Sequence, residues 1–243
     1  MVRITLDKPY IPIPVPVTAV KYGLLYNWYA ATDARNITSS NDWIVPTSTN
    51  WNTLITYLGG SGVAGGKLKE TGLTHWVTPN TGATNEVNYN GRGAGVRSYL
   101  GAFSEIGLYL WLTNYNFQLL TAFPVVLRNN NDDFNNGIND NENKKRNGVS
   151  IRIFRTATTE EQALADGTAC TPYTGNDGKN YRTVKIGTQV WIADNLCETK
   201  FRNGDWIPGF DGGVYTPFSN AAWAALTTGA LCAYNNDWSN VLI

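Results

Sequence analysis

Residues 177–196 read DGKNYRTVKIGTQVWIADNL, and this stretch decides how the rest of the chain is interpreted. Apolar or β-branched residues alternate with polar ones from Tyr181 to Ile186 and again from Gln189 to Ala193. Such alternation is typical of half-buried strands, and Gly187-Thr188 between them has the length of a two-residue turn. The stretch therefore predicts a tight antiparallel hairpin.

A short amphipathic helix is predicted directly after Pro46. Thr47 or Ser48 can cap the free amides at its start, and Gly59 supplies a left-handed stop. Between them, apolar side chains recur at helical spacing, at Trp51, Leu54, Ile55 and Leu58. We expect these four side chains to belong to the core.

Other elements are predicted from weaker signals. A second helix is expected around residues 219–226, capped by Ser219, and a third around residues 159–165. Residues 149–154 alternate as a strand does. Residues 129–147 are dominated by Asn, Asp and Lys, which predicts a long exposed loop or hairpin tip.

Several motifs resemble one known family, the Fibrobacter succinogenes major paralogous domain of bacterial and phage surface modules. The opening hairpin sequence looks like the start of that domain. Further matching motifs are YGLLYNWYA at 22–30, WIVP at 43–46, GGKLKETG at 65–72, HW at 75–76, GATNE at 82–86 and NGVSIR at 147–152. The resemblance implies an α+β C-type-lectin-like domain with a twisted antiparallel sheet, short helices and long loops.

The order of these motifs departs from the family pattern, as if the domain had been circularly permuted. Residues 176–243 resemble its opening part and residues 21–155 its later part, with residues 156–175 as a linker and residues 1–20 as a proline-rich arm. Two incomplete repeats do not explain this, because neither half duplicates the other. Residues 176–243 either fold back onto residues 21–155 or complete a neighbouring subunit. Fold-back is favoured because domain termini usually lie close together.

Composition excludes two classes of partner. The chain has 243 residues, 19 basic and 19 acidic, so it lacks the basic surface that nucleic acid or anionic lipid requires. No apolar stretch is long enough to enter a membrane. Nine Trp, thirteen Tyr and 24 Gly are typical of a loop-rich fold held by aromatic packing, or of a binding surface.

The sequence offers little catalytic chemistry, so we predict no enzyme, cofactor or metal. The single histidine, His75, has no serine or cysteine nucleophile near it in sequence and is interpreted as structural. Cys170, Cys197 and Cys232 form no zinc motif. They also lie outside the region where the related formylglycine-generating enzymes would place their reactive cysteine pair. An EF-hand aligned on Gly137 fails, because Phe134 and Asn143 fall at ligand positions.

A ligand-binding region is predicted where aromatic and amide side chains cluster, at a turn over residues 113–117 and in the loop over residues 129–141. A C-type-lectin-like fold would present these segments together, and their side chains could stack on and hydrogen-bond a glycan or protein ligand. A polar loop without a ligand is the alternative. The candidate residues are Tyr115, Asn116, Phe117, Asn129, Asn130, Asn131, Asp132, Asp133, Phe134, Asn135 and Asn136.

The N-terminal arm is predicted to dock on a partner protein, with packing against its own domain as the alternative. Prolines alternate with apolar residues there, which keeps the backbone extended and removes donors for sheet pairing. The expected contacts are Tyr10, Ile11, Ile13, Val15 and Val17.

The function expected from these observations is non-enzymatic surface recognition or decoration by a homo-oligomer. A phage virion protein of the head or tail is favoured over a bacterial surface or secreted adhesin, because the first residues do not resemble a signal peptide.

Overall fold

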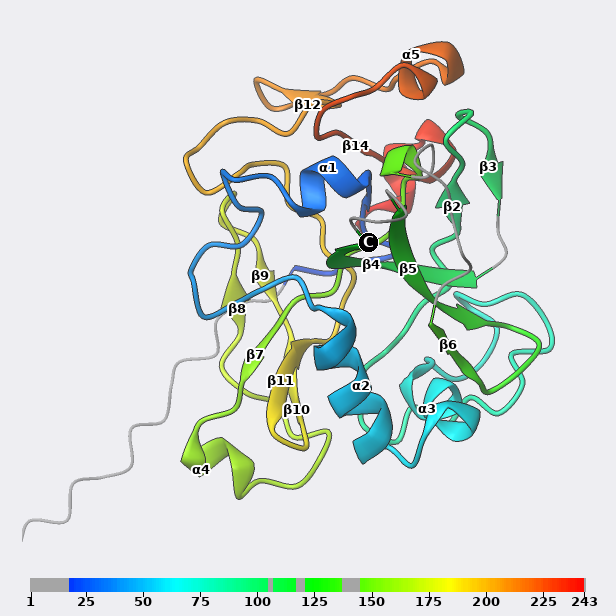
Figure 1. The fold of residues 1–243 in the computed structure, drawn as a ribbon, viewed down its shortest axis with the longest axis vertical. Helices are drawn as coiled ribbons and strands as arrows, with labels where there is room; N and C mark the ends of the chain where they lie inside the picture. Colours follow the sequence, from blue (N-terminus) through cyan, green and yellow to red (C-terminus); the bar gives the residue numbers. More distant parts are fainter. Residues whose placement is uncertain (1–17, 105–106, 117–120, 137–144, 243) are drawn as a thin grey trace, which may run out of the picture.

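The computed structural model describes residues 18–104, 107–116, 121–136 and 145–242. It shows an α+β protein with short helices and small antiparallel sheets (Figure 1). The helices are α1 (Trp28–Ala31), α2 (Ser48–Tyr57), α3 (Ser61–Leu68), α4 (Thr159–Gln162) and α5 (Asn220–Ala224), with 3-10 turns η2 (Tyr234–Asn236) and η3 (Trp238–Asn240). The strands form antiparallel pairs and triplets. They are β1 (Leu25–Tyr26), β2 (Val96–Arg97), β3 (Phe103–Ser104), β4 (Gly107–Asn116), β5 (Thr121–Arg128), β6 (Phe134–Asn136), β7 (Phe154–Thr156), β8 (Tyr173–Thr174), β9 (Asn180–Tyr181), β10 (Thr183–Ile186), β11 (Gln189–Ile192), β12 (Phe210–Asp211), β13 (Val214–Tyr215) and β14 (Leu231–Cys232).

The predicted hairpin is confirmed as β10 and β11. Ile186 pairs with Gln189 across the turn, where Gly187 adopts a φ of 57°. All eight strand residues are buried, since β7 pairs with β11 on the other side. Trp191 stacks on Phe154 at 4.8 Å and packs against Trp51 at 4.6 Å between ring centroids. Truncating a buried tryptophan of this kind costs about 3–5 kcal/mol.

The helix predicted after Pro46 is confirmed as α2. Thr47 caps it, and its side chain and that of Asn50 form a reciprocal capping box. Trp51 and Leu54 are buried as expected, and Gly59 has a φ of 101°. The helices predicted near residues 219–226 and 159–165 are also present, as the shorter α5 and α4.

Segments from opposite ends of the chain share one structural framework. Val20 bridges Leu242, β1 pairs with β14, and β7 pairs with β11, all antiparallel and within one chain. In Figure 1, β1 near the start of the chain therefore lies beside the red C-terminal part. One hydrophobic cluster contains residues from both ends, including Tyr26, Val149, Val190 and Leu231.

Three local predictions need correction. Thr113 to Asn116, expected in a turn, belong to β4, which pairs with β5 and has an irregular register between Trp111 and Tyr115. Part of the expected loop over residues 129–147 is strand β6, because Phe134 provides a side chain to bury. The strand expected over residues 149–154 is mostly isolated bridges, and regular pairing begins only at Phe154.

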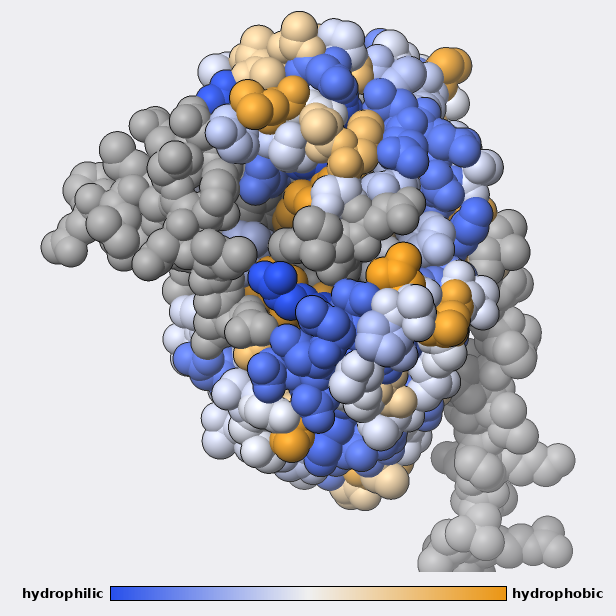
Figure 2. Space-filling model, turned by 90° about the vertical axis from the view of Figure 1, so that its right-hand side faces the viewer, coloured by the Kyte–Doolittle hydropathy of each residue, from blue (hydrophilic) through white to orange (hydrophobic). Residues whose placement is uncertain are grey.

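The surface is predominantly hydrophilic on the face shown in Figure 2, where apolar residues form small separate groups outside the grey atoms. Large exposed apolar side chains include Leu73, Leu100 and Val214. Such scattered residues are normal for a protein surface. In the described part of the chain, no helix combines the length and apolarity needed to cross a bilayer.

Candidate ligand-binding cleft

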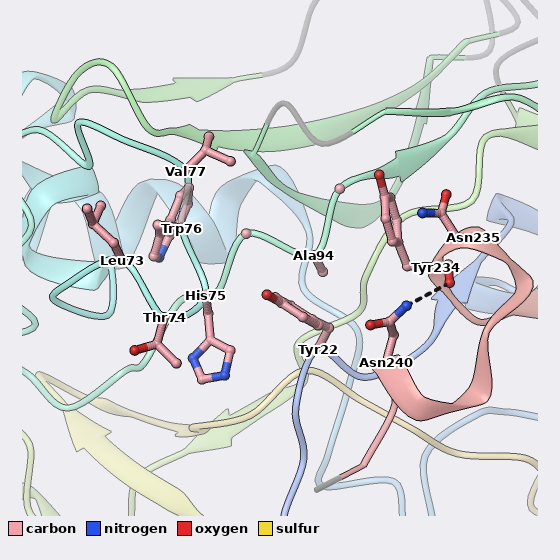
Figure 3. Close-up of a pocket in the computed structure, with 12 residues that line it drawn as sticks. Tyr22, Leu73, Thr74, His75, Trp76, Val77, Ala94, Tyr234, Asn235 and Asn240 are labelled. Carbon is pink, nitrogen blue, oxygen red and sulfur yellow. Dashed lines mark hydrogen bonds between the residues drawn. The ribbon is translucent and has the colours of Figure 1, made fainter.

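A cleft of about 330 Å³ lies where four separate chain segments meet (Figure 3). Tyr22 comes from the segment before β1, and residues 73–77 form a loop on the other side. Residues 93–95 run between them toward β2, and the 3-10 turns at residues 234–240 close the remaining side. Ligand pockets span about 300–1,000 Å³, so the cleft is the size of a small ligand unit.

An ion-paired network holds His75 in the cleft wall. His75 Nδ1 lies 2.5 Å from Glu70 Oε2, and Arg92 donates through Nε to Glu70 Oε1 at 2.9 Å. The carboxylate accepts both bonds, so Nδ1 of His75 is the donor toward Glu70, and Nε2 is the ring nitrogen that this contact does not use. Arg92 also donates to the carbonyl oxygens of Val20 and Lys21, which ties the segment leading to Tyr22 to this wall.

Trp76 forms a fixed part of the same wall. Its ring is buried, and its Nε1 donates to the Gly91 carbonyl at 2.8 Å. A Cβ at Gly93 would lie 3.2 Å from the Trp76 ring and 3.1 Å from the His75 carbonyl oxygen. Glycine at this position lets the backbone lie close to the aromatic side chain.

Tyr234 provides the opposite wall, and its packing depends on Gly95. Gly95 has a φ of 70°, and a Cβ there would lie 2.7 Å from the Tyr234 ring. Phe103 packs edge-on against Tyr234 at 5.5 Å. Asn240 Nδ2 donates to the Tyr234 carbonyl at 3.2 Å, which fixes the two 3-10 turns relative to each other (Figure 3).

The mouth of the cleft is apolar, and its lining is uncharged apart from what His75 can carry. Leu73 and Val77 are 57% and 45% exposed. Tyr22 packs edge-on against His75 at 5.3 Å between ring centroids. Among the residues that the structure describes, no Asp, Glu, Lys or Arg belongs to the lining, which comprises Tyr22, Leu73, Thr74, His75, Trp76, Val77, Gly93, Ala94, Gly95, Tyr234, Asn235 and Asn240.

The predicted loop lies beside the cleft rather than in its lining. Asn129 Nδ2 donates to the Thr78 carbonyl at 2.8 Å, next to the 73–77 loop. The buried Lys69 ammonium donates to the carbonyls of Thr81, Arg128 and Asn131 at 2.6, 2.9 and 2.7 Å. These bonds make the loop a support for the cleft wall.

Close packing against α3 further constrains this loop. Gly66 N–H donates to the Asp132 carbonyl at 3.1 Å, and a Cβ at Gly65 would lie 2.4 Å from the Asp133 carbonyl oxygen. Phe134 is 3% exposed and packs against Trp51 at 5.2 Å. The prediction that Phe134 contacts a ligand is therefore wrong, because its ring belongs to the core.

The other predicted site residues are placed as follows. Tyr115 and Asn116 end β4, Asn135 and Asn136 belong to β6, and Asn130 is exposed in the turn after β5. Phe117 and the arm residues Tyr10, Ile11, Ile13, Val15 and Val17 lie outside the described residues.

A family model for the Fibrobacter succinogenes major domain matches residues 5–155, more than half of the 243 residues. The chain belongs to this family. The match covers most of the arm segment and three of the four cleft segments, and it ends before residues 234–240. The interpretation of residues 176–243 as the opening part of the Fibrobacter succinogenes major domain stays a prediction.

Comparison with curated proteins gave no match, and comparison with solved structures gave none either.

The three cysteines are unsuited to nucleophilic chemistry. Burial is the main cause that raises the pKa of Cys170 to about 11 and the pKa values of Cys197 and Cys232 to about 12. None is paired in a disulfide. Thiolate is the reactive form, so these groups are inert near neutral pH. Among the described residues, no three His, Cys, Asp or Glu side chains gather as metal ligands would.

Sequence reasoning did not identify the cleft residues, although several lie in quoted motifs. Tyr22 begins the YGLLYNWYA motif and His75-Trp76 is a motif of its own. Tyr234 is far from both along the chain. The sequence did contain a signal for Tyr234, because two asparagines follow this aromatic residue. Asn235 and Asn236 adopt left-handed φ angles of 55° and 58°. Such residues mark turns that present neighbouring side chains.

Proposed function

We propose that this chain is a non-enzymatic recognition module, displayed on a surface, that binds a glycan or protein ligand in the cleft between Tyr22 and Tyr234. The observation that carries the proposal is the lining of the cleft, which consists of aromatic and amide side chains held by neighbouring residues. The volume of the cleft is that of a small ligand. Binding pockets combine apolar walls with a few fixed polar groups in this way.

The proposal that the protein is not an enzyme rests on the same lining. It contains no carboxylate, serine or cysteine, and the Nδ1 of His75 is engaged by Glu70. Hydrolytic sites usually pair such a base with a nucleophile or a second carboxylate. Recognition requires neither group.

The binding role is tested with the full chain and two single variants. Tyr234→Ala removes one cleft wall, whereas Tyr57→Ala removes a tyrosine that is 54% exposed on α2 and does not line the cleft. We expect attachment to intact bacterial cells or cell-envelope preparations to be lost only with Tyr234→Ala. Equal attachment by both folded variants and the original chain would refute a role for the cleft.

We also propose that the fold is a circularly permuted C-type-lectin-like domain whose two parts fold together in one chain. In the family order, the part that ends near residue 243 would continue directly into the part that begins near residue 21. The bridge between Val20 and Leu242 supports the permutation, because it brings these two ends together. A chain running from residue 164 to 243 and then directly from 18 to 163 restores that order. We expect it to fold with a similar melting temperature. Failure to fold would contradict the permutation.

The proposed setting is the surface of a phage virion, with anchoring to other virion proteins through the arm and assembly as a homo-oligomer. The family assignment and the alternation of proline with apolar residues in the arm support it. An extracellular or bacterial cell-surface adhesin is the alternative. Labelled antibodies against the cleft-bearing domain would distinguish them, by decorating purified phage particles or the host cell surface.

A further inference from the structure

The cleft also restricts the class of ligand, an inference that rests on the proposed binding role. We infer that the ligand is an uncharged saccharide end, one or two rings in length, and that one of its hydroxyl groups forms a hydrogen bond with His75 Nε2. The inference rests on the charge, shape and hydrogen-bonding groups of the lining.

Charge argues first. Among the described residues, no lysine, arginine, aspartate or glutamate is part of the lining. The ammonium groups of Lys21 and Lys69 lie behind it, 5.7 and 5.6 Å from the centroids of the Tyr22 and Trp76 rings, and both donate to backbone carbonyls. Glu70 is engaged by both His75 and Arg92, and Lys21 Nζ is 3.4 Å from the Ser239 carbonyl oxygen. A sialic acid, uronic acid or phosphate would lose water without gaining a cationic partner, which is unfavourable. A cationic peptide would likewise find no carboxylate.

Shape argues second. Tyr22 and Tyr234 are half-buried aromatic side chains, with Tyr22 between His75 and Tyr234, and Leu73 and Val77 add exposed apolar surface across from Tyr234 (Figure 3). A pyranose ring has apolar C–H faces and polar edges, so it can place a face on a tyrosine ring and its hydroxyls toward the polar groups. Tyrosine is suited to such mixed contacts, since it presents a large apolar surface with a polar end.

Hydrogen bonding argues third. Nδ1 of His75 is engaged by Glu70, so Nε2 is the ring nitrogen that can form a hydrogen bond with a ligand hydroxyl, which can donate or accept. Asn240 uses Nδ2 on the Tyr234 carbonyl, and its Oδ1 is an acceptor in the lining. A saccharide supplies several hydroxyl donors within one ring, whereas an extended peptide supplies one backbone donor per residue. In a cleft of about 330 Å³, the hydroxyl-rich unit matches better.

The test is a microarray of neutral, sialylated and uronic-acid glycans, followed by calorimetry with the neutral glycans that bind. We expect binding to neutral glycans, weakened at least tenfold by Tyr234→Ala, since losing one wall removes both stacking and desolvation. His75→Leu should weaken binding about five- to tenfold, in the range of one lost hydrogen bond. His75→Gln can keep a hydrogen-bonding group near the Nε2 position and should lose less.

Controls separate the ligand class from the binding role. Tyr57→Ala should bind like the original chain, and if Tyr234→Ala does not fold, the exposed Asn235→Ala and Leu73→Ala variants replace it. Binding only to acidic glycans, or to no glycan, would overturn the saccharide inference. The saccharide inference would also be overturned if cell attachment depended on Tyr234 but survived periodate oxidation of the cells. The recognition role would stand in that case. Cell attachment independent of Tyr234 would refute the binding role itself.

Discussion

Glu198 is a buried carboxyl group whose protonation should control stability. Its side chain is fully buried, and Tyr181 Oη donates to its Oε1 at 2.8 Å while the Asp177 amide donates to its Oε2 at 3.2 Å. Burial, and then the charge of Asp177, raises the pKa of Glu198 from 4.5 to about 8, against the opposing effects of Tyr181 and Lys179. Gly175 packs so closely that a Cβ there would overlap the carboxyl oxygen.

The direction and size of the effect follow from this pKa. Between pH 4.5 and about 8, folded Glu198 keeps a proton that the unfolded chain has released. The unfolded state therefore binds fewer protons, and stability falls as pH rises through this window and levels off on either side. A pKa of about 8 in place of 4.5 corresponds to roughly 5 kcal/mol at alkaline pH. This is a large share of the usual 5–15 kcal/mol for a domain.

Glu198→Gln should remove the pH dependence while keeping the shape of the side chain. Its carbonyl can accept from the Asp177 amide, and its NH2 can donate to Tyr181 Oη, whose own hydrogen can turn to Cys197 Sγ at 3.3 Å. Urea unfolding from pH 5 to pH 9 measures the effect, with Glu86→Gln as the same change on an exposed side chain. We expect the variant to gain several kcal/mol relative to the original chain on going from pH 5 to pH 9. A difference between the two proteins that does not change with pH would refute the reasoning.

Three further predictions concern the supports of the cleft and the arm. Lys69→Met should lower the free energy of unfolding by about 2–4 kcal/mol because it leaves three carbonyls without their donor. Lys67→Met, in the last turn of α3, should have little effect in the same urea titration. In a native-state hydrogen-exchange measurement, the amide of Asn130 should exchange faster than the amides of residues 54–58 in and at the end of α2. Slower exchange at Asn130 would contradict its placement in an exposed turn. Deleting residues 1–17 should leave a folded domain that no longer assembles, as measured by light scattering or particle incorporation, and normal assembly would show that the arm is not the docking element.

Local signals in the sequence were sufficient for the elements that need no distant partner. The turn at Gly187-Thr188 and the capping box at Thr47 each lie within a few residues, so the β10–β11 hairpin and α2 could be predicted. The helix α3 was missed because it contains Gly65 and Gly66, which normally disfavour helices. Gly65 lies against the backbone of Asp132 and Asp133, and Gly66 lies against the carbonyl of Gly82, so both glycines are required by segments that are distant in sequence.

The same contrast explains why the candidate binding residues predicted from the sequence do not coincide with the lining of the cleft. The polar run over residues 129–136 was interpreted from composition, but the single Phe134 within it packs on Trp51 and makes part of the run a strand. Lys69 then fixes Asn131 through its carbonyl. The polar composition predicted that residues 129–136 are exposed. In the structure, tertiary contacts instead hold much of this segment against α3 and the cleft wall.

The cleft itself depends on contacts that link the family-matched segment to the rest of the chain. Its rear is fixed by Glu70, Arg92 and Gly95, each of which has several close neighbours and little freedom to change. At its mouth, Leu73 and Asn235 are exposed and come from the two different parts of the chain. Substitutions at Leu73 should cost little stability, because exposed positions without special backbone geometry usually change folding free energy by less than about 0.5 kcal/mol, whereas Asn235 has a left-handed φ of 55° that most other residues would adopt with strain. A fixed rear with an exposed mouth fits the recognition role that we propose, because the fold does not depend on the exposed Leu73 side chain.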